Sequence, residues 1–204
     1  MKNGFGKLAL MLLALTLHVP ASAQMFSDSY TFLKAVKDRD GGKVTEMVDQ
    51  PGSVIVNTRE NGTGRTALHY VVERRDDVWL GFLLQKGANP QIADRRGETP
   101  LHLATQLSYL EGIKILLAGG AKVDPVNTSG ETPLIRAVQL RDVAAVRLLL
   151  AHGANPDRKD SVAGRSAREY AQQDNRAGEI FGMIEAGKKP ADAKGLDFSG
   201  PLFK

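Results

Sequence analysis

A short pattern recurs along this 204-residue chain at intervals of about 33 residues. It reads GRTALHYVV from Gly64, GETPLHLAT from Gly97 and GETPLIRAV from Gly130. An apolar run follows each copy and ends in a Gly-Ala pair, at Gly87-Ala88, Gly120-Ala121 and Gly153-Ala154. Self-similarity at this period is typical of a solenoid, in which each unit buries its apolar face against its neighbours because it cannot do so alone.

The copy that starts at Gly97 shows how one unit folds. Glycine there permits the chain reversal, and Thr99 with Pro100 begins a helix. The threonine side chain can accept an amide hydrogen bond that would otherwise be unpaired, and proline at the first helical position loses none. A second helix carries Ile113 and Leu116 at helical spacing and ends at glycines 119 and 120, because glycine accepts the left-handed cap conformation.

The Thr-Pro-Leu-His motif and the period at which it recurs resemble those of the ankyrin repeat family. The resemblance implies an all-α solenoid of about five helix-turn-helix units with short β-hairpin loops. We place the ankyrin repeat domain at residues 24–187, with units at about 26–63, 64–96, 97–129, 130–163 and 164–187. The end units depart from the pattern: Arg168 and Glu169, for example, replace Leu-His. Such departures are expected of capping units, which turn one face to water.

Two histidines, His69 and His102, stand at the same position of successive units. The resemblance implies that each hydrogen-bonds the backbone of the neighbouring turn and braces one unit against the next. No third metal ligand occurs at a matching spacing, and the chain has no G-x-S-x-G motif, phosphate loop or cysteine. We therefore expect a protein that is not an enzyme and that has no cofactor and no metal.

An Arg-Asp pair recurs between the two predicted helices of three units, as Arg39-Asp40, Arg75-Asp76 and Arg141-Asp142. Aspartate at this place can cap the second helix. Two roles are open for the arginines. They are either solvated loop residues or side chains that bind an acidic partner.

Ankyrin repeat proteins usually bind through the hairpin tips and the exposed side of the first helix, which together line a concave groove. Alignment on the third unit places the tip residues at Arg65, Arg95, Arg96, Glu98, Thr128, Ser129, Glu131 and Arg165. The groove positions on the first helices are Glu73, Gln106, Gln139 and Gln173, and they are flanked by Arg74, Leu107, Leu140 and Asp174. We expect Leu107 and Leu140 to face solvent, giving an interface with an apolar centre and a polar edge. The alternative is that their own loops partly cover both leucines.

The first 23 residues have the features of a secretory signal. Lys2 and Lys7 precede an apolar run at residues 8–19, and small residues follow at 21–23. The run is shorter than the roughly 20 residues of a membrane-spanning helix, so a retained anchor is the less favoured alternative. We predict a signal peptide at residues 1–23 that is cleaved after Ala23. The mature protein would then be periplasmic or secreted, with no stable membrane anchor.

The net charge does not predict a nucleic-acid surface. The chain has 27 lysines and arginines against 23 aspartates and glutamates, a formal net charge of +4. Lys2 and Lys7 belong to the predicted signal, and further lysines lie in residues 188–204, so the repeats are close to neutral. Nucleic-acid binding would require a clustered basic face.

The final segment, residues 188–204, has no helical periodicity, and we expect a flexible C-terminal tail. Its apolar residues leave open docking on the repeats or on a partner. The sequence as a whole predicts a monomeric, non-catalytic scaffold that binds a protein partner in the periplasm. The alternative is a secreted, effector-type ankyrin protein that acts on a target outside the producing cell.

Overall fold

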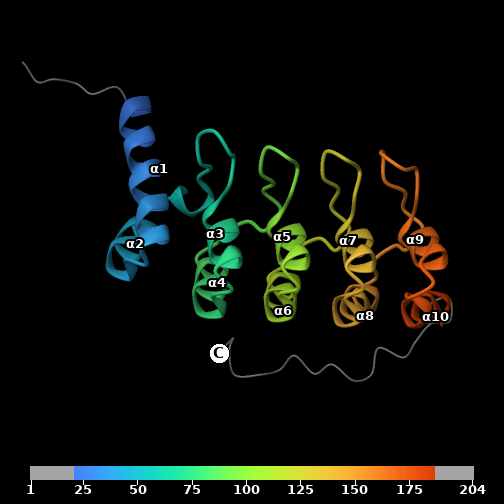
Figure 1. Cartoon of the computed structure of the whole chain (residues 1–204). Coiled ribbons are helices and arrows are strands. Elements are labelled where there is room, and N and C mark those ends of the chain that lie inside the picture. The colour runs from blue at the N-terminus through green and yellow to red at the C-terminus, as the bar shows by residue number, and fades with distance from the viewer. Residues whose placement is uncertain (1–20, 187–204) are drawn as a thin grey trace, which may run out of the picture.

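A computed structural model describes residues 21–186 of the chain, with side chains from residue 28 onward. The predicted tail at 188–204 lies outside the described residues, as does the predicted signal peptide apart from residues 21–23. Figure 1 shows helix pairs standing in a row, with the loops between consecutive pairs projecting on one side. This arrangement is the all-helical repeat solenoid that the sequence predicts.

The helices pair in chain order within the described range. The pairs are α1 (Ala21–Asp38) with α2 (Gly41–Val48), α3 (Ala67–Glu73) with α4 (Asp77–Gln85), α5 (Pro100–Gln106) with α6 (Leu110–Ala118), α7 (Pro133–Gln139) with α8 (Val143–Ala151), and α9 (Ala167–Gln173) with α10 (Gly178–Ala186). A short 3-10 helix, η1 (Ile55–Asn57), follows α2. The pairs lie within the ranges predicted for the five units, except that α1 begins at Ala21, before the predicted first unit. No helix in the described part is long and apolar enough to cross a bilayer.

Polar residues define where the helices begin. Thr66, Thr99, Thr132 and Ser166 are extended N-cap residues of α3, α5, α7 and α9. The aspartates of the recurring Arg-Asp pair cap the second helices, because the carboxylates of Asp40, Asp76 and Asp142 accept the amides of Lys43, Trp79 and Ala145. The predicted capping role of these aspartates is therefore confirmed.

One apolar core runs through all five units. Leu68, Leu101 and Leu134 occupy corresponding positions in three units and are 1%, 0% and 0% exposed. Helix α5 packs against α6 of its own unit and against α3 and α7 of its neighbours. Small buried residues such as Ala104 and Ala137 lie at this interface and allow the helices to approach closely. Each unit therefore depends on its neighbours for burial of its apolar surface.

The loops between units have the shape of hairpins, but no β-strand forms in residues 21–186. In the second loop the amide of Asp94 donates to the carbonyl of Glu98 at 2.8 Å, and in the third the amide of Asn127 donates to Glu131 at 3.1 Å. Only an isolated bridge between Lys159 and Ser166 has ladder geometry. The predicted β-hairpins are thus hairpin-shaped turns without paired strands in the described residues.

Neighbouring hairpins are joined directly through their backbones. The amides of Arg95, Thr128 and Ser161 donate to the carbonyls of Thr63, Arg96 and Ser129 at 2.9, 3.0 and 2.8 Å. Gly97 makes this approach possible. Its φ is +74°, and a Cβ there would lie 2.8 Å from the amide nitrogen of Thr128. Both its left-handed conformation and the contact with the next hairpin require glycine.

Candidate protein-binding surface

A hollow of about 460 Å³ opens between the second and third units. The hairpins and helices α3 and α5 line it. The hollow brings together six of the predicted tip and groove residues: Arg65, Glu73, Arg95, Arg96, Glu98 and Gln106. Leu103 supplies an apolar part of the wall. At these residues the surface between the second and third units is concave.

The predicted groove positions recur with equal spacing along the stack. Glu73, Gln106, Gln139 and Gln173 are the last residues of α3, α5, α7 and α9, and all four are exposed. Arg65 lies at the hairpin end of its unit and forms an ion pair with Glu73 at 3.0 Å. Three of the four positions present amide side chains, which can both donate and accept hydrogen bonds.

The two leucines that follow the glutamines differ in exposure. Leu140 is 45% exposed, as expected. Leu107 is half-buried and packs against the core, so it faces solvent less than expected. Arg75 of the preceding unit donates to the carbonyl of Leu107. In the unit before Leu140 the position of Arg75 is taken by Ser108, whose side chain is too short to make the equivalent bond.

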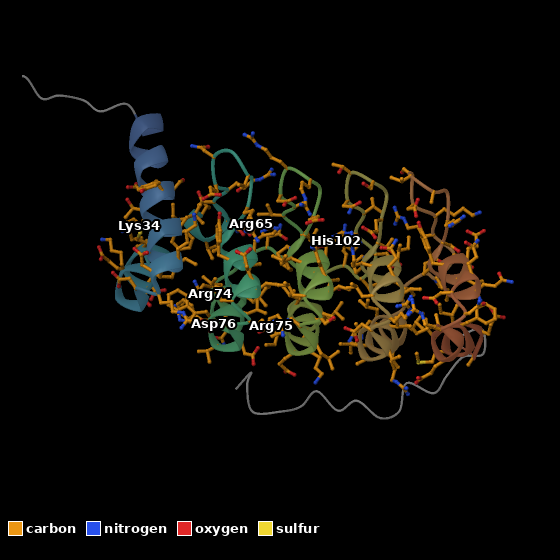
Figure 2. All side chains as sticks on the ribbon, in the orientation of Figure 1. Lys34, Arg65, Arg74, Arg75, Asp76 and His102 are labelled. Atoms are coloured by element: carbon orange, nitrogen blue, oxygen red, sulfur yellow. The ribbon has the colours of Figure 1, made fainter. Side chains whose placement is uncertain are left out.

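The expectation that Arg74 lies in the groove is corrected by the structure. Its side chain is 19% exposed and donates to the carbonyl of Val36 in the first unit at 2.6 Å. Its guanidinium lies 3.6 Å from the carboxylate of Asp76 and 5.6 Å from the ring centre of Trp79. Burial lowers the pKa of Arg74. In Figure 2, Arg74, Arg75 and Asp76 lie at the connection between α3 and α4, away from Arg65 at the hairpin side.

The expected tip positions of Glu98 and Glu131 are also corrected, because these residues are 8% and 7% exposed. The returning arm of each hairpin folds beneath the tip and carries its glutamate inward. The carboxylate of Glu98 pairs with Arg96 at 2.6 Å, and that of Glu131 pairs with Arg136 at 2.6 Å. An approaching molecule therefore meets the arginines first.

The histidines make the backbone contacts that the resemblance implies. His69 contacts the carbonyl of Glu98 through Nε2 at 2.9 Å, while its Nδ1 accepts the amide of Thr66 at 3.0 Å. An Nδ1 that accepts a hydrogen bond and an Nε2 that donates one together assign the neutral Nε2-protonated tautomer. His102 repeats this geometry in the next unit. Burial lowers the pKa of both imidazoles below the ordinary 6.5.

The arginines of the recurring Arg-Asp pairs have a role that neither open alternative describes. Arg39, Arg75 and Arg141 have left-handed backbones, with φ of 61°, 56° and 56°. Each side chain reaches the next unit. Arg39 lies 3.4 Å from Asp76, Arg75 donates to the Leu107 carbonyl, and Arg141 donates to Asp174 at 2.6 Å. These arginines hold adjacent units together.

A second series of contacts between units was not predicted from the sequence. Asn57 accepts the amide of Asn89 at 2.7 Å and donates to the carbonyl of Gly87 at 3.1 Å. Gln91 makes the same two bonds one unit later, to Lys122 and Gly120. The spacing between Asn57 and Gln91, close to one repeat, is the signal that could have revealed this series.

Asp124 continues this series with a carboxylate in place of an amide. Its Oδ2 accepts the amide of Asn155 at 2.8 Å. Its Oδ1 is buried and has no hydrogen-bond partner within the described residues. Burial raises the pKa of Asp124. A carboxylate has no N–H to donate, so the second bond of the series is missing here.

In residues 28–186, no three or more histidine, aspartate or glutamate side chains gather closely enough to hold a metal ion. The titratable groups described above take part in caps, ion pairs and backbone contacts. The described residues offer a long polar surface with a half-apolar hollow between the second and third units, which suits binding to an extended segment.

Comparison with known proteins identifies the repeats. Residues 32–127 and 80–160 match the family described as "Ankyrin repeats (3 copies)", which together is more than half of the chain. Similar proteins include Oxysterol-binding protein homolog 1 of Saccharomyces cerevisiae, 28% identical over 99 residues, which are 47% of this chain and 8% of that protein. The 2-5A-dependent ribonuclease of Homo sapiens is 32% identical over 77 residues, 38% of this chain and 10% of that protein.

A putative ankyrin repeat protein of Rickettsia felis is 42% identical over 53 residues, 24% of this chain and 23% of that protein. The chain thus spans less than a quarter of the length of each of these relatives. The similarity lies in the repeats, where the family match and the stacked helix pairs coincide. The chain therefore belongs to the ankyrin repeat family.

Proposed function

We propose that this protein is a non-catalytic scaffold that binds a protein partner through its concave groove and hairpin tips. Ankyrin repeats indicate a protein–protein interaction scaffold, and the family is generally non-catalytic. The observation that carries the proposal is the row of exposed side chains at the ends of α3, α5, α7 and α9, opposite the buried faces of the same helices. These exposed side chains contribute little to the packing of the core and are accessible to a partner protein.

The enzymatic or lipid-related names of the relatives do not transfer to this chain. The chain spans 8% of the yeast protein and 10% of the human ribonuclease. Both matches are to a small part of a longer protein. We propose that the shared part supplies binding alone and that this protein acts as a monomer.

We further propose that the mature protein works in the periplasm after cleavage behind Ala23. The charged, apolar and small-residue regions of the first 23 residues support this location. The second candidate, a secreted effector, rests on the same segment. N-terminal sequencing of the protein from the producing cell, combined with fractionation, tests both. A mature N-terminus at Gln24 in the periplasmic fraction is expected, Gln24 in the medium favours the effector, and retained Met1 contradicts export.

The binding function is tested by a triple groove variant, Gln106→Glu, Gln139→Glu and Leu140→Glu. The control adds the same charge at exposed positions on the second helices: Gln85→Glu, Ala144→Glu and Ala151→Glu. Each protein is used as bait in an extract of the producing cell, and its melting is followed by circular dichroism. We expect the wild type and the control to retain the same partner and the groove variant to lose it, with all three remaining folded. Loss with the control as well, or retention by the groove variant, would contradict a groove-based scaffold.

A further inference from the structure

The hairpins of this stack expose charges of one sign only. Each of the four hairpins is closed by a backbone hydrogen bond between its two arms. We define the hairpin crest as these four closed segments, each with the one residue that precedes it: residues 59–65, 93–98, 126–131 and 159–165. Its exposed charged side chains are Arg59, Arg95, Arg96, Lys159 and Arg165. Its carboxylates, Glu60, Asp94, Glu98, Glu131 and Asp160, are all half-buried or buried. The crest is therefore more basic at its surface than its composition indicates.

The carboxylates are turned inward because the turns use them. Asp94 accepts the amides of Arg96 and Glu98 at 2.8 and 3.0 Å. Asp160 accepts three amides of its own turn through Oδ1, and the hydroxyl of Tyr170 through Oδ2 at 2.7 Å. Burial by itself raises the pKa of Asp160, but these hydrogen bonds outweigh it and lower the pKa. These bonds stabilise the charged form of Asp160, and both carboxylates face the turn backbone.

The arginines of the crest are directed outward and are weakly compensated. Arg95 has no ion pair with any residue that the structure describes. Among the residues that the structure describes, Arg59 donates to the carbonyls of Gly64 and Ala93, at 3.2 and 2.7 Å. Arg96 pairs with Glu98, but its side chain is 67% exposed and covers the glutamate. Arg165 lies over the ring of Tyr170 at 5.9 Å, which leaves its guanidinium hydrogens free for another group.

The crest is also preorganised. Arg95, Thr128 and Ser161 bond through their amides to the preceding hairpin, so the tips form one continuous row instead of separate loops. A ligand that lies along this row does not have to order four loops, and that lowers the entropic cost of binding.

We propose that the hairpin crest binds an acidic segment of the partner protein, with aspartate or glutamate side chains paired to Arg59, Arg95 and Arg96. This inference rests on the proposed scaffold function and names the chemistry of its partner. Guanidinium groups bind carboxylates through paired hydrogen bonds, and the site lacks exposed carboxylates that would repel the ligand. Thr128 and Ser129 interrupt the basic row in the third segment of the crest, so a second acidic group is expected to meet Arg165 in the fourth.

A peptide fits this surface better than a nucleic acid does. Gln106 and Gln139 lie exposed at the groove ends of α5 and α7. Their amides can donate to carbonyls and accept from N–H groups of an extended peptide backbone, whereas a phosphate backbone offers only acceptors.

The test uses the folded full chain and three fluorescent peptides of equal length: one rich in aspartate, glutamate and leucine, one with the corresponding amides, and one rich in lysine. A single-stranded DNA of similar length is the fourth probe. Fluorescence anisotropy gives the Kd of each at low and at high salt. The crest variant is Arg95→Gln, Arg96→Gln and Arg165→Gln. The control variant, Lys114→Gln, Lys122→Gln and Arg147→Gln, removes the same charge away from the crest.

We expect the acidic peptide to bind at least about tenfold more tightly than the amide peptide, with a Kd that weakens in high salt. The crest variant should lose about tenfold in affinity for it, while the control variant stays within about twofold. Equal binding of acidic and amide peptides, or equal loss in both variants, would overturn the acidic-segment proposal and leave the scaffold function intact. Tighter binding of DNA would overturn it in favour of a nucleic-acid surface. In the capture experiment, by contrast, retention of the partner by the groove variant or its loss from the control variant counts against the scaffold function itself.

Discussion

The Nε2 atom of His102 donates a hydrogen bond to the backbone carbonyl of Glu131, 29 residues further along the chain, at 3.1 Å. The same ring accepts the amide of Thr99 through Nδ1 at 3.2 Å, so one buried imidazole holds its own helix start and the loop of the next unit. Only the neutral ring can make both bonds, because a protonated Nδ1 cannot accept one. The contact between units is therefore sensitive to pH.

Acidification should weaken the stack. Burial lowers the pKa of His69 and His102 in the folded protein below the ordinary value of 6.5, so the unfolded chain binds protons first as pH falls. The stabilisation is complete above about pH 6.5 and is lost as pH falls through the lower folded pKa. Urea unfolding at pH 7.5 and 5.5 measures this. The variant His102→Ile, chosen because Ile135 stands at this position in the next unit, should show a smaller difference between the two pH values. An unchanged difference would contradict the assignment to this ring.

Truncation of the shared leucine should unfold part of the stack. Leu101→Ala and Leu134→Ala remove fully buried side chains and should each lower the free energy of unfolding by about 2–5 kcal/mol, through lost burial and a residual cavity. Leu140→Ala is the control, since Leu140 is 45% exposed, and should change stability by about 0.5 kcal/mol or less. Chemical denaturation compares the three. A large effect of Leu140→Ala would mean that this residue belongs to the core.

Two glycines with the same backbone conformation should respond differently to alanine. Gly97 and Gly120 have φ of +74° and +85°. A Cβ on Gly120 meets nothing within 4 Å, whereas one on Gly97 lies 2.8 Å from the amide of Thr128. Gly120→Ala should lower the free energy of unfolding by about 1–2 kcal/mol, because alanine must then adopt the left-handed backbone conformation. Gly97→Ala should cost more and should separate the hairpins, seen as faster amide exchange at Thr128. Equal costs would mean that the close approach contributes nothing.

Replacement of Asp124 by asparagine should stabilise the protein. The amide would restore the donor that Asn57 and Gln91 provide in earlier units, and it would remove a buried unpaired oxygen, so we expect a gain of about 0.5–1.5 kcal/mol at pH 7. Burial raises the pKa of Asp124, and the protonated acid can itself donate. The folded state thus binds this proton more readily than the unfolded chain, and the gain should shrink as pH falls towards 4. Asn57→Asp is the matched reverse change and should destabilise the protein. Equal stability of Asp124→Asn and the wild type would contradict this account.

The sequence was most informative where the contact is local or repeated. The caps at Asp40, Asp76 and Asp142 follow from the residue type next to a helix start, and the histidine contacts follow from a position that is shared between units. It was least informative for long side chains. Arg74, predicted in the groove, reaches back to Val36, and Arg75 reaches forward to Leu107. An arginine can extend in several directions at similar cost, so its partner depends on which neighbour lies within reach.

The sequence by itself determined that the chain is an all-helical ankyrin solenoid, because a pattern repeated at a constant spacing places the same apolar positions against each other in every unit. Only the tertiary structure decided which charges face a partner. Glu98 and Arg96 are two residues apart and equally polar, yet the stacking of one hairpin on the next turns the carboxylate inward and leaves the guanidinium in solvent. Burial depends on the adjacent unit, and a residue's own sequence position does not contain that information.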